Sequence, residues 1–599
     1  MPFHTLDYPR PQMVRDNWKN LNGDWEFSFD DEDVGIRDKW YENFPSARHI
    51  CVPFASETEL SGIHDEKLHR QVWYKRSFFI TRNDEKVTNR MILHFEGSDY
   101  STSLWINGIP AGTHNGGYER FSFDITAFVI DGENTITVRV TDSENIYQPR
   151  GKQRWRNESY ECWYVQTTGI WKTVWMEEVN ETYIEELKLT PAFQKQEIVI
   201  DGMITGILKQ QIGNGNYSVE LECSFEKKIV RRVNISLSDL SFHTVMNVFS
   251  ANDDWTGVKA WSPSEPNLYD LTIRLINNER EIDKVTSYFG MREIRIENGN
   301  ILLNGIPLYQ KLILDQGYWK NSGLTPPNEQ ALIDDIDKIH EMGFNGLRKH
   351  QKIEDERFLY WCDVKGMLVW SEAPATYAFS DQAVCCFTEE WIKIVKQNYN
   401  HPCIITWTPF NESWGVPEIE TSKAQQHFTE GIYYLTKALD PYRPVICNDG
   451  WEHTVSDVVT LHDYTEKGAD FHKRYSENKD GIFSTEVYHC KTKSAMANGF
   501  AYHGQPVIIS EYGGIAFTSG ESKDWGYGNK VNNEEEFLER YRSITSAIKE
   551  IPWISGFCYT QLTDVQQEVN GLLNEERKEK VEPSKIKEIN DEAVTGRFI

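Results

Sequence analysis

The sequence Ile404-Ile405-Thr406-Trp407-Thr408-Pro409-Phe410-Asn411-Glu412-Ser413-Trp414 is a short apolar run that ends in a glutamate. A second run, Pro506-Val507-Ile508-Ile509-Ser510-Glu511, ends in the same way. Runs of this length are typical of buried strands, and a carboxylate buried there is costly unless it has a purpose. In a barrel of parallel strands the chemistry lies at the carboxyl ends of the strands. Two glutamates placed like this are the pair that a retaining glycosidase needs.

The region around these runs, residues 291–599, alternates short apolar strands with amphipathic helices. This pattern predicts βα units and a parallel sheet. The eight expected strands lie near Leu308–Leu314, Phe344–Arg348, Met367–Trp370, Ile404–Phe410, Pro444–Cys447, Val458–Leu461, Val507–Ser510 and Ile554–Tyr559. Eight such units indicate a TIM barrel, with Glu412 after the fourth strand and Glu511 after the seventh. The charge-rich tail after Glu575 is expected to be solvated.

Two all-β regions precede the barrel. Residues 1–180 contain alternating apolar and polar positions, as in Trp25–Phe29 and Ile136–Val140, which predicts half-buried strands of a sandwich. Residues 181–290 show the same alternation, for example in Tyr217–Cys223. Their length of about 100 residues suits an immunoglobulin-like sandwich.

The composition excludes some classes of partner. The chain has 599 residues and a formal net charge of -28, which argues against nucleic acid or anionic membranes as partners. No stretch is long and apolar enough to span a bilayer, and Met1–Asp7 lacks the features of a leader peptide, so a cytoplasmic protein is expected unless a leader was removed. The 10 cysteines form no CxxC pair and are interpreted as small buried hydrophobic residues.

Several further segments make the chain resemble glycoside hydrolase family 2, which includes β-galactosidases, β-glucuronidases and β-mannosidases. In the first region the resemblance is carried by Leu104–Gly108, His114–Tyr118 and Thr168–Trp175. In the last region it is carried by Asn304-Gly305, Gly343–Asn345 with Arg348, and Asn400–Pro402 through Glu412. The resemblance implies a jelly-roll sugar-binding-like domain over residues 1–180, an immunoglobulin-like β-sandwich over 181–290 and a catalytic TIM barrel over 291–599.

The resemblance also implies roles. Glu412 matches the family's acid/base, Glu511 its nucleophile, and Asn411 the asparagine that hydrogen-bonds the sugar 2-hydroxyl. An acid must be protonated at rest, so we expect burial and nearby negative charge to raise the pKa of Glu412. Glu511 must be ionised to attack the anomeric carbon. The alternative is that both glutamates are structural carboxylates paired with Arg348.

Other side chains are candidates for binding the substrate. Tyr464 is expected to orient the nucleophile, and Tyr559 falls where the family has a tryptophan platform under the sugar, although both tyrosines could instead be core residues. The candidate substrate-binding residues are Asn411, Arg348, His350, Asp315, Glu161, His462, Tyr464 and Tyr559.

The identity of the sugar is predicted from a difference between this chain and the β-glucuronidases of the family. Family β-glucuronidases carry an Asn-x-Lys pair after the eighth strand that binds the sugar carboxylate, whereas this chain has Glu568-Val569-Asn570-Gly571. A desolvated carboxylate needs a positive partner, so a neutral β-hexoside, a galactoside first, is expected. A β-glucuronidase or other β-uronidase stays open, because Arg348-Lys349-His350 offers positive charge.

Two further expectations concern metals and activity. Glu372 fits one metal-ligand position of some family β-galactosidases, but Pro374 stands where a histidine ligand is expected, so we predict no catalytic metal and no cofactor. The expected partner is a glycoside or oligosaccharide, and a homo-oligomer stays open. An alternative of another class is a non-catalytic carbohydrate-binding protein with an inactive barrel.

Overall fold

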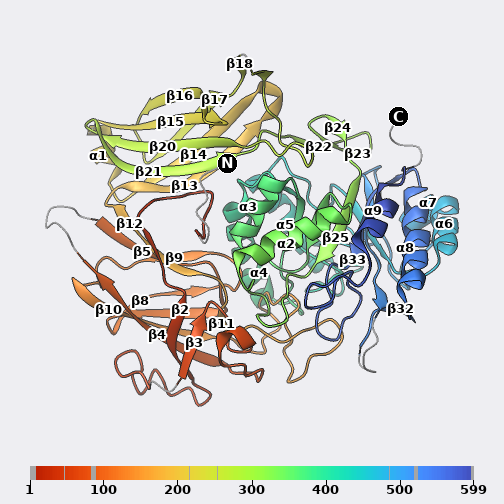
Figure 1. Ribbon diagram of the computed structural model, residues 1–599, viewed down its shortest axis with the longest axis horizontal. Helices are drawn as coiled ribbons and strands as arrows, with labels where there is room; N and C mark the ends of the chain where they lie inside the picture. The colour runs from red at the N-terminus through yellow and green to blue at the C-terminus, as the bar shows by residue number, and fades with distance from the viewer. Residues whose placement is uncertain are drawn as a thin grey trace.

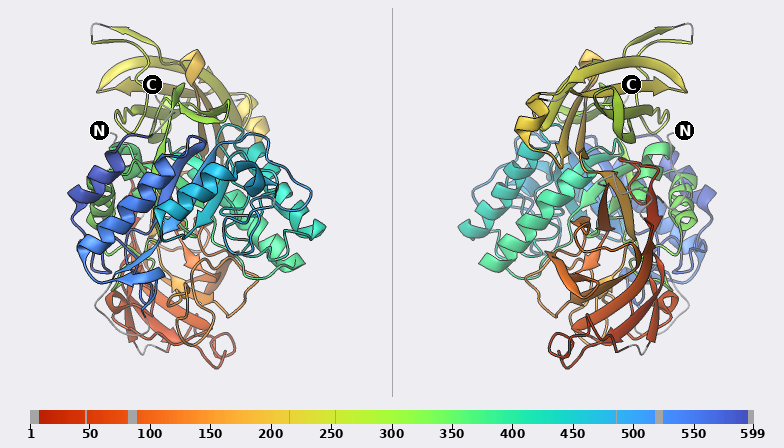
Figure 2. Two further views of the ribbon diagram at one scale, coloured as in Figure 1. Left: turned by 90° about the vertical axis from the view of Figure 1, so that its right-hand side faces the viewer. Right: turned by 90° about the vertical axis from the view of Figure 1, so that its left-hand side faces the viewer.

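The computed structural model describes residues 8–45, 48–81, 89–214, 216–252, 254–484, 486–517 and 524–594. Figure 1 shows two β domains on the left and an α/β barrel on the right, and in both views of Figure 2 the barrel lies between the β domains. Within the described ranges, no helix has the length and apolar character needed to cross a membrane. Met1–Asp7, on which the localisation prediction depends, lies outside the described residues.

The first domain is a sandwich of a six-stranded sheet, β3-β2-β4-β10-β7-β8, and a four-stranded sheet, β1-β12-β5-β9. Alternate residues of the strands, such as Trp25, Phe27, Leu93 and Phe95, fill the space between the sheets. The elements are β1 Trp18–Asn20, β2 Gly23–Phe29, β3 Arg48–Val52, η1 Glu59–Ser61, β4 Gln71–Ile80, β5 Asn89–Phe95, β6 Ser98–Asp99, β7 Ser101–Ile106, β8 Ile109–Asn115, β9 Phe121–Asp124, β10 Gly132–Thr141, β11 Gly169–Ile170 and β12 Val174–Asn180.

The second domain is a smaller sandwich, in which the sheet β13-β14-β17 faces the sheet β16-β15-β20-β21. Its core contains Ile198, Ile200, Val219, Leu221 and Ile273 from alternating strand positions. The elements are β13 Tyr183–Ala192, η2 Phe193–Lys195, β14 Glu197–Thr205, α1 Lys209–Asn214, β15 Tyr217–Phe225, β16 Lys228–Ser236, β17 Ser241–Asn247, β18 Ser250–Asn252, β19 Trp255–Gly257, β20 Tyr269–Asn277 and β21 Arg280–Phe289.

The third domain is a TIM barrel built on a seven-stranded parallel sheet in the order β28-β27-β26-β25-β33-β30-β29. A small three-stranded antiparallel sheet of β22 Ile294–Glu297, β23 Asn300–Leu303 and β24 Ile306–Pro307 leads into it. The strands are β25 Gln310–Asp315, β26 Gly346–Lys349, β27 Leu368–Glu372, β28 Ile404–Thr408, β29 Val459–Asp463, β30 Val507–Gly513, β31 Ile515–Phe517, β32 Tyr527–Val531 and β33 Ile554–Thr560. The helices are α2 Glu329–Glu341, α3 Glu356–Lys365, α4 Asp381–Asn398, α5 Lys423–Leu439, α6 Gly468–Glu477, α7 Lys479–Phe483, α8 Glu534–Lys549 and α9 Pro583–Asp591.

The strand predicted at Pro444–Cys447 is not a regular strand. The segment still closes the barrel between β28 and β29, because Trp407 N donates to Pro444 O at 3.0 Å, Ile446 N to Trp407 O at 2.9 Å and Asp457 N to Val445 O at 2.9 Å. Pro444 has no N–H to donate to a ladder, so the pairing is reduced to isolated bridges such as Trp407 with Val445.

The prediction of a solvated tail after Glu575 was also wrong. Within it, α9 buries Ile586 and Ile589 against the rest of the barrel core. Pro583 occupies the first turn of this helix, where its missing N–H has no cost. Two apolar residues three positions apart are enough to anchor a charged amphipathic helix.

A buried cluster joins the second domain to the barrel. His401 Nδ1 lies 2.6 Å from Asp363 Oδ2, which also accepts a 2.8 Å hydrogen bond from Tyr288 Oη of β21. The second oxygen of Asp363 accepts from Cys403 N, at the start of the path to β28. Burial opposes the charged imidazole, but Asp363 and Glu356 outweigh it and raise the pKa of His401 to about 9.

This cluster predicts a pH-dependent stability. A folded-state pKa above the ordinary 6.5 stabilises the protein fully below pH 6.5, and the contribution is lost as the pH rises through about 9. The contribution is on the order of 3 kcal/mol by the conversion of pKa to free energy. We expect His401→Asn to lower the melting temperature more at pH 6 than at pH 9.5, as measured by calorimetry. An equal loss at both pH values would contradict a charged His401.

Candidate active site

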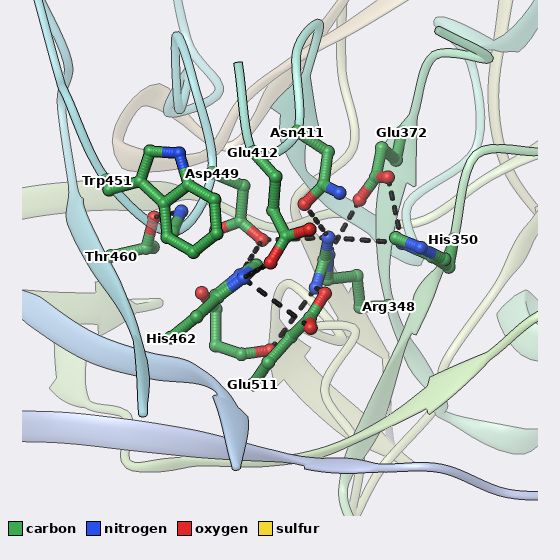
Figure 3. A network of polar contacts seen from close by, with 12 residues as sticks. Arg348, His350, Glu372, Asn411, Glu412, Asp449, Trp451, Thr460, His462 and Glu511 are labelled. Atoms are coloured by element: carbon green, nitrogen blue, oxygen red, sulfur yellow. Dashed lines mark hydrogen bonds and ion pairs between the residues drawn. The ribbon is translucent and has the colours of Figure 1, made fainter. Parts of the chain in front are cut away.

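The two glutamates meet at the carboxyl ends of the barrel strands, as Figure 3 shows. Glu412 lies in a tight turn after β28, in which Glu412 and Ser413 both have positive φ angles, 51° and 59°. The Glu412 amide donates to Asp449 O at 2.9 Å, which fixes this turn to the irregular fifth segment. Glu511 lies within β30 and is 4% exposed. The barrel therefore brings both predicted catalytic residues into one buried site.

Glu511 is held from two sides. Arg348 Nη1 donates to Glu511 Oε1 at 2.7 Å, and the Tyr464 hydroxyl donates to Glu511 Oε2. His462 Nδ1 lies 3.5 Å from the same Oε2. These contacts fix the orientation of the carboxylate.

Arg348 is the centre of the polar network in Figure 3. Its side chain is fully buried, its Nε lies 2.6 Å from Glu372, and its Nη2 lies 2.9 Å from Asp449 and 2.6 Å from Asn411 Oδ1. Burial raises the pKa of Glu372 to about 7, although Arg348 opposes this.

His350 lies at the edge of this network and is neutral. Its Nδ1 is 3.1 Å from Arg348 Nη2 and 3.0 Å from Glu372. Burial, together with the charges of Lys152 and Arg348, lowers the pKa of His350 well below its ordinary value.

His462 joins Glu412 to Asp449. Its Nδ1 is 2.8 Å from Glu412 Oε1 and its Nε2 is 3.0 Å from Asp449 Oδ2. Burial disfavours the charged ring, but Glu511, Asp449 and the hydrogen bonds raise the pKa of His462 to about 10.

Our expectation of a raised pKa for Glu412 was wrong. Burial does favour its neutral form, but the hydrogen bond and the positive charge of His462, with Lys152 and Arg348, lower the pKa of Glu412. The sequence argument counted burial and negative charge near Glu412, and it missed the cations that the fold brings there.

Three predicted substrate-binding residues lie elsewhere. Tyr559 is fully buried and packs on Tyr541 and Phe537 of α8, so it faces outward from the barrel. The next residue, Thr560, points into the barrel, and its Oγ1 lies 3.3 Å from the Tyr464 hydroxyl. Asp315 is occupied by Lys349 and by the Gly317 amide.

Glu161 also does not contribute its carboxylate. It is exposed, and its backbone carbonyl accepts hydrogen bonds from Trp525 and Gln567 at the barrel mouth. Tyr464, Asn411, Arg348 and His350 do lie in the site, whereas both ring nitrogens of His462 face protein carboxylates.

Sequence reasoning missed three site residues. Asp449 follows the apolar segment Val445–Cys447, and its place after a barrel strand was a signal that could have identified it. Lys152 comes from the jelly-roll domain and is 7% exposed. Burial works against its charge, but Cys162, Tyr377, Glu568 and Glu412 together raise the pKa of Lys152. Glu568 is 3% exposed and accepts hydrogen bonds from Tyr164 and Asn570.

Comparisons with known proteins agree with this architecture. Family models match the sugar binding domain of glycosyl hydrolases family 2 at residues 18–176, a family 2 domain at 182–292 and the family 2 TIM barrel domain at 294–592. The chain belongs to glycoside hydrolase family 2. It is therefore a glycosyl hydrolase.

This chain is about equally similar to relatives named β-galactosidase and to relatives named β-glucuronidase. A β-galactosidase of Thermoanaerobacter pseudethanolicus is 26% identical over 86% of this chain and 67% of its own length. A β-glucuronidase of Mus musculus is 24% identical over 90% of this chain and 83% of its own length. The chain spans 50% and 49% of the lengths of two other curated relatives. A solved β-glucuronidase of an uncultured Clostridium has the same fold, with a TM-score of 0.77, 20% identity, and coverage of 97% of this chain and 99% of that one.

Proposed function

We propose that this chain is a retaining exo-β-glycosidase, in which Glu511 is the nucleophile and Glu412 the acid/base. The observation that carries the proposal is the spacing of the two carboxylates. One oxygen of each, with one nitrogen of His462, lies within 4.8 Å of the others. Retaining enzymes have carboxyl groups about 5–5.5 Å apart, whereas inverting enzymes need roughly 6.5–9.5 Å to admit a water molecule.

The surroundings of the pair support the same mechanism. Arg348 and Tyr464 orient Glu511, so that its carboxylate can attack the anomeric carbon. Asn411 is 2% exposed, and its Nδ2 has no hydrogen-bond partner among the residues that the structure describes. A buried donor without a partner is costly, so we assign this N–H to a sugar hydroxyl. A non-catalytic carbohydrate-binding protein would not need the two carboxylates at this spacing.

For the sugar, a neutral β-hexoside, galactoside first, is the specific proposal. The Arg348-Lys349-His350 cluster offers little free charge, because Arg348 pairs with three carboxylates and Lys349 with Asp315 and Glu354. Where family β-glucuronidases carry Asn-x-Lys, this chain places the buried acid Glu568. Burial raises the pKa of Glu568, Lys152 opposes this, and Glu511 adds to it. A second acid beside a sugar carboxylate would disfavour a uronide.

A β-uronide is the second candidate, and one observation favours it. Lys152 is a buried cation whose charge interacts with both Glu412 and Glu568. The mouse and Clostridium relatives are named β-glucuronidases. If the sugar carries a carboxylate, Lys152 rather than Lys349 is the cation placed to bind it.

The nucleophile can be tested by covalent trapping. Because Glu511 lies at the carboxyl end of β30 with its carboxylate fixed by Arg348, a 2-fluoro β-glycoside that is turned over should label it. We expect Glu511→Gln to abolish turnover and labelling. Peptide mass spectrometry that finds the label on another carboxylate would refute the assignment.

The acid/base can be tested by rescue. Glu412→Ala should slow alkyl glycosides about a hundredfold or more, but dinitrophenyl glycosides much less, because a good leaving group needs little protonation. Added azide should restore the rate and give a β-glycosyl azide, detected by NMR. Equal losses on all leaving groups, without an azide product, would remove Glu412 from this role.

The sugar can be tested with p-nitrophenyl glycosides. We expect the β-D-galactoside to be turned over faster than the β-D-glucuronide or galacturonide, since about 3 kcal/mol for an unpaired buried carboxylate is more than a hundredfold in kcat/KM. Glu568→Gln should reduce this preference by removing the acid from the pocket, whereas Glu576→Gln, in the same loop but exposed and paired with Lys320, should not. If the glucuronide or galacturonide is instead turned over faster than the galactoside, and Lys152→Met removes this preference, the second candidate is established.

A further inference from the structure

The imidazole of His462 contacts three carboxylates of the network, those of Glu412, Asp449 and Glu511. It is fully buried, its Nε2 contacts Asp449, and its Nδ1 lies 2.8 Å from Glu412 and 3.5 Å from Glu511. In Figure 3 dashed lines run from the ring to Glu412, Asp449 and Glu511. Both ring nitrogens therefore contact protein carboxylates, and neither is left to bind a substrate hydroxyl.

The backbone is shaped around this ring. Gly450 has a φ of +101°, and a Cβ added there would meet His462 Nδ1 at 2.6 Å. The Gly450 carbonyl accepts the His462 amide at 3.2 Å, and the Trp451 ring packs against the imidazole at a centroid distance of 5.5 Å. The imidazole therefore cannot turn away from Glu412 without displacing the Gly450–Trp451 segment.

The charges around the ring decide where the proton lies. Arg348 neutralises part of the charge of Asp449 and Glu511. The other histidines nearby are His350, His453 and His489. Burial lowers the pKa of His350 well below its ordinary value and the pKa values of His453 and His489 to about 4 and about 3, so all three are neutral. His462 is left as the charged imidazole, hydrogen-bonded to the Glu412 carboxylate.

We propose that Glu412 and His462 share one catalytic proton, which His462 holds in the resting enzyme while Asp449 fixes the ring. This rests on the proposed function, because it assigns the source of the proton that a retaining glycosidase needs. Glu412 is the catalytic residue that touches the leaving oxygen, and His462 is a positioning residue that acts through it.

The proton follows a balanced path. In glycosylation, Glu511 forms a bond to the anomeric carbon, the glycosidic C–O bond breaks, and the leaving oxygen takes a proton from Glu412. Glu412 receives a proton from His462 Nδ1, so the imidazole becomes neutral and Glu412 ends as a carboxylate. In deglycosylation, water attacks the anomeric carbon, the bond to Glu511 breaks, and the proton of the water returns through Glu412 to His462.

The nucleophile controls this transfer. The negative charge of Glu511, 3.5 Å away, stabilises the imidazolium in the resting enzyme. When Glu511 becomes an ester, that charge disappears and His462 holds its proton less tightly. The proton is therefore released in the step that consumes it, and it is held again when Glu511 is freed.

The test is His462→Gln, which keeps a polar side chain but cannot carry the proton. We expect kcat/KM for an alkyl β-glycoside to fall about a hundredfold, within the usual range for general acid catalysis, and for a dinitrophenyl glycoside less than about fivefold. Glu412 must then hold the proton alone, so the basic limb of the pH profile should move to lower pH by more than about one unit. Asp449→Asn should move the limb in the same direction by less.

The control is His489→Gln, which removes another buried imidazole that bonds Gly450 O. It should leave the leaving-group dependence and the basic limb unchanged, with the melting temperature recorded for each variant. An equal loss on both leaving groups in His462→Gln, with an unmoved basic limb, would overturn the shared proton. If azide still rescues Glu412→Ala in that case, the glycosidase assignment stands, and if it does not, the proposed function fails as well.

Discussion

The fully buried guanidinium of Arg348 is the constraint on which the site depends. A buried charge without partners costs several kcal/mol, so this side chain fixes Glu372, Asp449 and Glu511 around it. Those three come from β27, the fifth segment and β30, on different sides of the barrel. One side chain from β26 therefore sets the relative position of elements that are far apart in the sequence. Glu511, the proposed nucleophile, takes its orientation from that same set of contacts.

The jelly-roll domain also contributes side chains to this site. Its Lys172 donates to Ile353 O of the barrel at 2.8 Å, and its Arg150 amide donates to Ala375 O in the loop after β27. These contacts carry the segment that contains Lys152 and Tyr164 to the barrel mouth, where Tyr164 bonds Glu568. The site is thus shared between two domains, and a cation from one balances carboxylates from the other.

Much of the fold could be predicted from the sequence, because buried parallel strands leave apolar runs and half-buried strands leave alternation. Glu412 and Glu511 were found because they end such runs. Tyr559 was misplaced because the pairing of β30 with β33 contains register shifts, and a one-residue slip exchanges the two faces of a strand. Lys152 could not be found, since no local pattern tells which residue of a distant domain will be buried beside Glu412. The lowered pKa of Glu412 was missed for the same reason.

The irregular fifth segment and the turn at Glu412 are held together by hydrogen bonds, and each accounts for the unusual backbone of the other. A non-glycine residue in the left-handed region costs about 1–3 kcal/mol and persists only where neighbouring structure imposes it. Here Glu412 N donates to Asp449 O, and Ser413 N donates to Asn448 Oδ1 at 3.0 Å. The Ser413 hydroxyl adds a 2.6 Å hydrogen bond to Glu452. Residues of a regular fifth strand would use their polar groups in ladder hydrogen bonds. Here the segment leaves the ladder after Ile446, and the residues that follow are free to hold the turn. The same irregular segment places Asp449 and Gly450 against His462. It therefore supplies the backbone carbonyl that holds the Glu412 turn, and also the Asp449 carboxylate that fixes the His462 ring beside Glu412.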